Sequence, residues 1–136
     1  MRRGKRLGKY RLERRIGSGS FADVWKARDT IEQRDVALKI ATPGIVDLHG
    51  KKEIEHEARI ASKLTHPHIV SVRNADWIEG HFVLATDLAE KNLAQYAGAK
   101  RSETVALRVI RDVAEGLAYA HDRHVLHRDI KPENIM

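Results

Sequence analysis

The chain has 136 residues, of which 42% are hydrophobic and 32% charged, and its formal net charge is +6 at pH 7. This composition is typical of a globular chain and excludes an intrinsically disordered one. The absence of cysteine excludes disulfides and thiolate metal sites. No apolar run reaches the roughly 18 residues of a membrane span, and no apolar segment of a secretory signal follows the basic N-terminus. We therefore expect a cytoplasmic protein without a membrane segment.

Much of the positive charge lies in the first fifteen residues, where Glu13 is the only acid. A basic cluster of this kind can contact nucleic acid or an acidic membrane. Net charge alone does not specify a fold, however, and we interpret residues 1–8 as a solvated basic leader. We expect no nucleic-acid partner. The basic residues are Arg2, Arg3, Lys5, Arg6, Lys9, Arg11, Arg14 and Arg15.

Two strands are predicted on either side of a glycine-rich turn. Apolar residues among charges predict a strand over residues 9–16, and alternation predicts a second over Val24–Arg28. The turn between them contains Gly17 and Gly19, which let the backbone approach phosphate oxygens and present N–H donors. Because a strand and not a helix follows the glycines, the segment does not fit a dinucleotide fold or a Walker loop.

A third strand, V-A-L-K-I at residues 36–40, follows a turn over residues 29–34. Strand alternation places Val36 and Leu38 on one face and Ala37 and Lys39 on the other. Thr42-Pro43-Gly44 then breaks the strand. A helix is predicted over residues 51–64 from apolar residues three and four apart, and it carries Glu57.

The second half of the chain begins with two more predicted strands and continues with helices. The strands cover residues 69–77 and 81–85, the helices residues 91–98 and 102–123 with Ser102 as N-cap, and Val125–Leu126 and Ile135–Met136 are predicted strand fragments. His121, His124 and His127 are three residues apart, but they cannot share one helical face, and no carboxylate cluster completes a metal site there.

The segment H-R-D-I-K-P-E-N, residues 127–134, concentrates chemical groups. Asp129 could accept a proton from an attacking hydroxyl, and Lys131 could hold a transferring phosphate beside it. Asn134 offers an amide oxygen suited to a hard cation such as Mg²⁺. The alternative is a polar turn without chemistry.

These motifs together resemble the protein kinase family. H-R-D-x-K-x-x-N resembles the kinase catalytic loop, and the lysine resembles the serine/threonine branch. V-A-L-K resembles the family's V-A-I-K, and K-L-T-H-P-H-I-V at residues 63–70 resembles the passage from helix C into strand four. Ala22 stands where the glycine-rich pattern has its third glycine. The resemblance covers residues 10–136.

The resemblance implies an α+β, protein-kinase-like fold: a five-stranded antiparallel N-lobe sheet with helix C, plus the start of a helical C-lobe. We expect a leader at 1–8, the N-lobe at 9–85, a hinge at 86–90 and a partial C-lobe at 91–136. The kinase D-F-G and A-P-E motifs are absent from these residues, so we expect a fragment of a longer kinase domain. The alternative is a pseudokinase-like module that binds nucleotide or a partner without catalysis.

The resemblance also implies ATP and Mg²⁺ as cofactors and a serine or threonine hydroxyl of a protein as acceptor. Asp129 would be the base, Lys131 would stabilise phosphate charge, Lys39 would hold the phosphates with Glu57 as its partner, and Asn134 would bind Mg²⁺. Ala85 would take the gatekeeper place before the hinge. The nucleotide-binding residues would be Ile16, Gly17, Ser18, Gly19, Ser20, Phe21, Ala22, Val24, Ala37, Lys39, Thr86, Leu88 and Met136.

Overall fold

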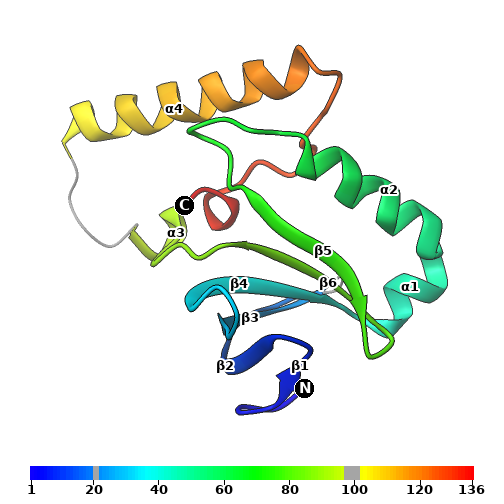
Figure 1. Ribbon diagram of the computed structural model, residues 1–136. Coiled ribbons are helices and arrows are strands. Elements are labelled where there is room, and N and C mark those ends of the chain that lie inside the picture. Colours follow the sequence, from blue (N-terminus) through cyan, green and yellow to red (C-terminus); the bar gives the residue numbers. More distant parts are fainter. Residues whose placement is uncertain (20–21, 97–101) are drawn as a thin grey trace. The chain divides into compact units, whose positions relative to one another are not determined.

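The structure, a computed structural model, describes residues 1–19, 22–96 and 102–136. The chain divides into two compact units (Figure 1). We call Met1–Lys63 with Ser71–Leu88 the sheet unit, and Leu64–Val70 with Ala89–Met136 the helical unit. Ser20 and Phe21, both predicted to bind nucleotide, lie outside the described residues.

The sheet unit contains one antiparallel sheet with the strand order β1-β2-β3-β4-β6-β5. The strands are β1 (Arg6–Leu7), β2 (Tyr10–Ser18), β3 (Ala22–Asp29), β4 (Arg34–Ala41), β5 (Val72–Ile78) and β6 (His81–Asp87). Sheet and helices together confirm the predicted α+β class.

The sheet has six strands and not the predicted five, because residues 6–7 pair with β2. The expectation that residues 1–8 form an irregular leader was therefore wrong at this point. Gly8, at φ 54°, helps to turn the chain between the two strands. Leu7, at 0% exposure, is part of the core. A two-residue strand carries no alternation, so the sequence pattern could not reveal it.

One face of the sheet forms the core of the sheet unit. Val36, Leu38 and Ile40 are 2%, 0% and 3% exposed, whereas Lys39 between them is exposed. Ala37, at 8% exposure, is buried as well, so burial alone does not alternate along β4; cross-strand register places Ala37 and Lys39 on the face opposite Val36 and Leu38. The core cluster consists of Leu7, Tyr10, Leu12, Trp25, Ala27, Val36, Leu38, Ile40, Val83 and Ala85. Burial of such side chains contributes about 1.5–3 kcal/mol each for the larger ones.

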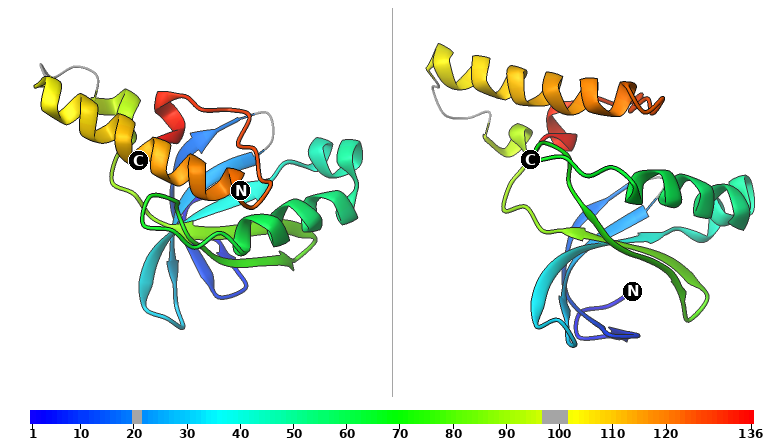
Figure 2. Two further views of the ribbon diagram at one scale, coloured as in Figure 1. Left: turned by 90° about the horizontal axis from the view of Figure 1, so that it is seen from above. Right: turned by 45° about the horizontal axis from the view of Figure 1, so that its top comes forward.

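Two helices follow β4. The chain does leave the strand at Thr42, but Pro43 then begins a helix that was not predicted, α1 (Pro43–His49), because proline fits the first helical position. Gly50, at φ 76°, separates it from α2 (Lys51–Ser62). Helix α2 lies along β5 (Figure 2), where Trp77 Nε1 donates a 2.7 Å hydrogen bond to Glu55 Oε1.

The helical unit contains α3 (Leu93–Tyr96), α4 (Glu103–His121) and the 3₁₀ turn η1 (Pro132–Asn134). Ser102 is at the N-cap position of α4, as predicted. The predicted strand fragments at 125–126 and 135–136 were wrong: these residues are in neither strand nor helix. Instead of a strand partner, Ile135 O accepts a 2.7 Å bond from Leu93 N. Among the described helices, none is both long and apolar enough to cross a bilayer.

Candidate active site

The segment 127–134 brings two predicted catalytic side chains and the predicted metal ligand together in the helical unit. Lys131 Nζ lies 2.9 Å from Asp129 Oδ2. Asn134 Nδ2 donates to the same carboxylate oxygen at 3.1 Å and to the Asp129 backbone carbonyl at 2.9 Å. Turn η1 supplies this geometry, because it begins at Pro132 and folds Asn134 back toward Asp129. One carboxylate thus faces one ammonium and one amide.

Backbone geometry at Arg128 contributes to this arrangement. Arg128 has φ 62°, a left-handed conformation that is uncommon for a residue with a side chain. Its neighbours are tied by a local bond, in which Asp129 N donates to His127 Nδ1 at 3.3 Å. Such conformations persist where surrounding contacts enforce them, and they occur often at functional sites.

The charge state of Asp129 follows from these contacts. The Lys131 ammonium, with smaller contributions from Asn134 and His127, holds the pKa of the Asp129 carboxyl below its usual range. Asp129 in turn raises the pKa of Lys131. Both side chains are well exposed, at 61% and 48%. Asp129 is therefore ionised at neutral pH and accessible to a hydroxyl from solvent or from another molecule.

Asn134 also fits the predicted role of metal ligand. Both of its side-chain hydrogen bonds use the side-chain amide nitrogen, Nδ2. Within the described residues its Oδ1 oxygen therefore has no hydrogen-bond partner. A free amide oxygen beside an ionised carboxylate is the kind of hard oxygen donor that Mg²⁺ prefers.

In the sheet unit, five of the predicted nucleotide-binding residues share one face of the sheet. Cross-strand partners in an antiparallel pair lie on the same face. Val24 is opposite Lys39, Gly17 is opposite Val24, and Thr86 is opposite Ala37. This face is opposite the core, so Lys39 is exposed on it. Within the described residues, Lys39 has no hydrogen-bond or ion-pair partner.

The glycine-rich turn closes through a 3.1 Å bond from Gly19 N to Ala22 O. A Cβ atom built on Gly17 would come no closer than 3.5 Å to Val24, and one built on Gly19 no closer than 3.8 Å to Ala22 O. Neither glycine has a positive φ. The protein's own packing therefore leaves room for side chains here. The small size of these residues would matter only to something outside the chain that approaches the backbone.

The structure does not bring Lys39 and Glu57 together. Both side chains are exposed, and the described part of the chain contains no ion pair between them. Glu55, one half-turn earlier on α2, is the helix carboxylate that contacts the sheet, through Trp77. The Lys39–Glu57 pair remains a prediction.

The structure places Ala85, the residue predicted to take the gatekeeper place, on the core face of the sheet and not on the face of Ala37. The gatekeeper assignment itself remains a prediction. Ala85 is opposite Leu38 and only 1% exposed, so it belongs to the core face. Thr86 lies on the face of Ala37, and its hydroxyl oxygen is 3.5 Å from the Ala37 carbonyl oxygen. A shift of one residue moves a strand side chain to the other face. The sequence could not decide this, because the strand's own pattern does not show which pairs form.

The remaining predicted residues lie in separate places. Ile16 is 37% exposed on β2, Ser18 Oγ donates to Asp23 Oδ1 at 2.8 Å, and Leu88 follows β6. Met136, 63% exposed, is in the helical unit. Each is accessible, and none is buried in a core.

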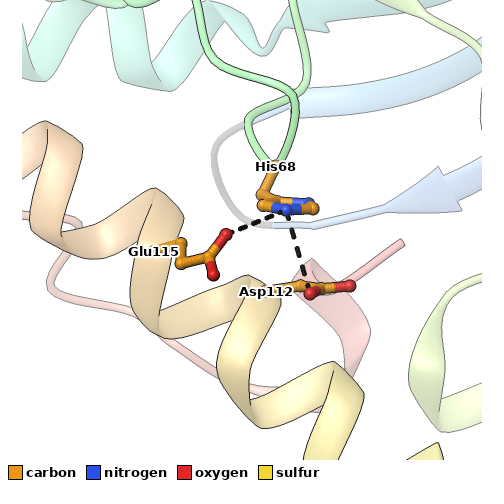
Figure 3. Close-up of side chains that lie close together, drawn as sticks. All are labelled: His68, Asp112 and Glu115. Atoms are coloured by element: carbon orange, nitrogen blue, oxygen red, sulfur yellow. Dashed lines mark ion pairs between the residues drawn. The ribbon is translucent and has the colours of Figure 1, made fainter.

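A further polar cluster was missed by sequence analysis. His68 Nε2 lies 3.3 Å from Glu115 Oε2 and 3.8 Å from Asp112 Oδ1 (Figure 3). Arg111 Nη2 already contacts that Asp112 oxygen at 2.7 Å. Because the carboxylates have a cationic partner, we assign the cluster to holding the loop 64–70 on α4. The acids are three residues apart on the helix, but nothing in the sequence links them to His68.

Comparison with known proteins gives consistent results. The family described as protein kinase domain matches residues 10–136. The serine/threonine-protein kinase PknD of Mycobacterium tuberculosis is 35% identical over 98% of this chain and 21% of its own length. PknJ of Mycobacterium bovis is 36% identical over 93% of this chain and 22% of its own. The crystal structure of the M. tuberculosis PknI kinase domain matches at a TM-score of 0.82 and 26% identity, over 98% of this chain and 56% of that one. The chain thus spans about a fifth of these curated relatives and about half of the solved domain.

Proposed function

We propose a kinase function for this chain, which belongs to the protein kinase family. In this proposal it carries the nucleotide-binding and catalytic-loop residues of a protein serine/threonine kinase. The observation that carries the proposal is the contact set around Asp129. A lysine ammonium and an asparagine amide each lie within hydrogen-bond distance of one ionised carboxylate. This is the set that phosphoryl transfer to a hydroxyl needs.

In this proposal, Asp129 orients the acceptor hydroxyl and takes its proton. The hydroxyl oxygen forms a bond to the γ-phosphorus of ATP while the bond to the β–γ bridging oxygen breaks, and ADP leaves. Lys131, which is 2.9 Å from Asp129, stabilises the charge on the transferring group. Catalysis of this kind relies on positioning and electrostatic stabilisation.

The nucleotide-binding roles are proposed for the sheet unit. Lys39, exposed and unpaired on the face of Ala37 and Val24 within the described residues, would hold the phosphates, with Glu57 as partner once α2 moves toward it. Gly17 to Ala22 would cover the phosphates. Thr86 and Leu88 would border the adenine, together with Ile16, Val24, Ala37 and Met136.

Mg²⁺, when bound, would neutralise phosphate charge, and Asn134 would contribute its Oδ1 oxygen as a ligand. The natural acceptor is proposed to be a protein, and the compartment the cytoplasm. The serine/threonine branch is favoured by Lys131 and by the names of the relatives.

The test is transfer of radiolabel from γ-labelled ATP to a generic acceptor protein by the full-length natural protein. We expect transfer, and we expect Asp129→Asn to reduce it by about 10²–10⁴-fold while ATP binding is retained. ATP binding without transfer in the unmodified protein would favour the non-catalytic, pseudokinase-like alternative. Equal transfer by the variant would contradict the assignment of Asp129 as base.

A further inference from the structure

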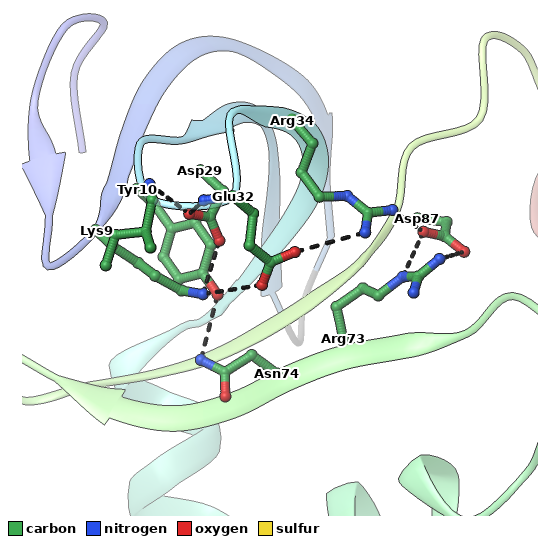
Figure 4. Close-up of polar contacts among 9 residues, drawn as sticks. Lys9, Tyr10, Asp29, Glu32, Arg34, Arg73, Asn74 and Asp87 are labelled. Carbon is green, nitrogen blue, oxygen red and sulfur yellow. Dashed lines mark hydrogen bonds and ion pairs between the residues drawn. The ribbon is translucent and has the colours of Figure 1, made fainter.

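Two arginines hold the side chain of Asp87, the last residue of β6 (Figure 4). Arg73 binds the carboxylate with both arms of its guanidinium: Nε lies 2.7 Å from Oδ1 and Nη2 lies 3.0 Å from Oδ2. Arg34 Nη2 adds a contact of 3.1 Å to Oδ1. We call this group the Asp87 clamp. It joins three neighbouring strands, β4, β5 and β6.

The positions of both arginines in the sheet bring their side chains to the Asp87 carboxylate. Arg34 is the first residue of β4, and Val36, two residues further, is the cross-strand partner of Asp87. Arg73 lies at the register shift of β5, between Val72 and Asn74. A β-bulge redirects the side chain at the extra residue. The register shift therefore accompanies the turn of the Arg73 side chain toward the end of β6.

The clamp is more suited to setting geometry than to adding stability. The side chains of Arg73, Asp87 and Arg34 are 41%, 39% and 38% exposed. Ion pairs this accessible to water contribute little to folding. The Asp87 contact raises the pKa of Arg73, and a two-armed arginine contact fixes orientation as well as distance. What the clamp determines is where the end of β6 points.

The backbone beyond the clamp has free hydrogen-bonding groups. Asp87 N donates to Ser71 O at 3.3 Å, and the Thr86 hydroxyl donates to Asp87 O at 3.4 Å. The next residue, Leu88, has no backbone hydrogen bond to any part of the chain that the structure describes. Its N–H and C=O groups are therefore available to the edge of a bound base.

We propose that the Asp87 clamp is a positioning element for the base-binding backbone at residues 86–88, and so determines affinity for the adenine part of the nucleotide. This inference rests on the proposed function, because it takes ATP as the substrate. Asp87 does not touch the nucleotide in this scheme. It acts by holding the end of β6, the strand that Leu88 follows.

The experiment separates the base from the phosphates. Dissociation constants of the full-length protein are measured by calorimetry for adenosine and for ATP with Mg²⁺. Asp87→Asn keeps the size of the side chain and removes its charge, and Arg73→Gln removes the two-armed contact. We expect each to weaken adenosine and ATP binding by the same factor, about threefold to tenfold, which corresponds to about 0.7–1.4 kcal/mol. Asp87→Glu, which keeps the carboxylate, should recover most of the affinity.

The controls exclude a general loss of structure. Arg28 forms a similar pair with Asp35, at 3.1 Å and with 33% and 34% exposure, on the same sheet. Arg28→Gln should leave both affinities unchanged. The double variant Arg73→Gln/Asp87→Asn should bind no more weakly than Asp87→Asn alone, because loss of the carboxylate already removes the Arg73 contact. Lys39→Met should weaken ATP binding far more than adenosine binding.

The outcomes are distinguishable. Unchanged adenosine affinity in Asp87→Asn, or equal losses in Arg28→Gln, would overturn the clamp while leaving the kinase assignment intact. If the unmodified protein bound neither ATP nor adenosine, that result would contradict both the proposed function and the clamp inference. The inference would be supported if the clamp variants, and not Arg28→Gln, weakened the binding of adenosine and of ATP by the same factor.

Discussion

The sheet unit and the helical unit hold their functional groups in different ways. In the sheet unit, a cluster of ten buried residues, with Ile78 of β5 packed against it, holds the six strands together. The face that carries Ala37 and Lys39 is set by cross-strand register. In the helical unit, Gly116 and Ala120 are the only buried residues of α4, while Leu107 and Ile110 are 60% and 65% exposed. The groups around Asp129 are held there by polar contacts between residues at most five positions apart.

This difference shows which changes each site can tolerate. A site held by register depends on packing far from it, because a core change alters several strands together. A site held by local polar contacts depends on its own side chains and on one or two backbone conformations. The predictions below test this contrast from the largest expected effect to the smallest.

Replacing Lys39 with methionine should reduce phosphoryl transfer by roughly 10²–10³-fold, since a charge aimed at the phosphates is lost. Lys26 is the matched control. It lies on the neighbouring strand and is paired with Glu13 and Asp35 at 3.1 and 2.9 Å. Lys26→Met should leave transfer within about twofold, because a partly exposed surface pair contributes little. Radiolabel transfer at saturating acceptor measures both. Equal losses would mean that Lys39 has no special role.

Replacing a buried core residue of the sheet unit with alanine should lower the free energy of unfolding far more than replacing an exposed apolar residue of α4. Leu38 is 0% exposed, and its replacement by alanine should lower the free energy of unfolding by about 2–5 kcal/mol. Ile110, at 65% exposure, should cost less than about 0.5 kcal/mol. Urea unfolding of the two variants provides the comparison. Similar costs would show that α4 is covered in solution, contrary to its exposure here.

The buried carboxylate of Asp29 should make the sheet unit sensitive to acid. Asp29 is 2% exposed and lies 2.7 Å from Lys9 Nζ (Figure 4). Burial alone would raise its pKa, but Lys9 and the N–H groups of Glu32 and Ile31 outweigh burial and hold the pKa below its ordinary range. The Asp29 hydrogen bond raises the pKa of Lys9 to about 12.

The sign of the effect follows from these directions. A depressed carboxyl pKa gives stability that is present above the unfolded value, near pH 4, and lost as pH falls through the folded value. The raised lysine pKa gives stability that is present below about pH 10.5 and lost as pH rises through the folded value. Asp29→Asn should lower the free energy of unfolding by about 1–3 kcal/mol at pH 7. It should also reduce the dependence of that free energy on pH below about pH 5. An unchanged slope between pH 5 and pH 2 would contradict this.

Two glycines in helices should respond in opposite directions to alanine. A Cβ on Gly116 would lie 2.9 Å from the His68 carbonyl oxygen, so Gly116→Ala should push the loop 64–70 away and cost about 1–3 kcal/mol. Gly44, in α1, has no atom within 4 Å of its Cβ position. Gly44→Ala should stabilise by about 0.5–1 kcal/mol. Hydrogen exchange in the two segments measures each effect locally. Destabilisation by both would point to something other than the His68 contact.

The sequence by itself determined the family, the α+β class and the residues of the catalytic loop. These features are local: H-R-D-I-K-P-E-N lies within eight residues, and the alternation along residues 36–40 is enough to assign the two faces of β4. Short-range patterns of this kind are set by chain geometry, which each segment carries on its own. The contact of Asp129, Lys131 and Asn134 follows from one turn.

The tertiary structure alone decided everything that depends on partners distant in the sequence. It showed the strand at residues 6–7, Thr86 in place of Ala85 on the face of Ala37, and the clamp that joins Arg34 and Arg73 to Asp87. It also left Lys39 and Glu57 unpaired with each other. Strand register and bulge position are chosen by the packing of the whole sheet, so no single segment contains them.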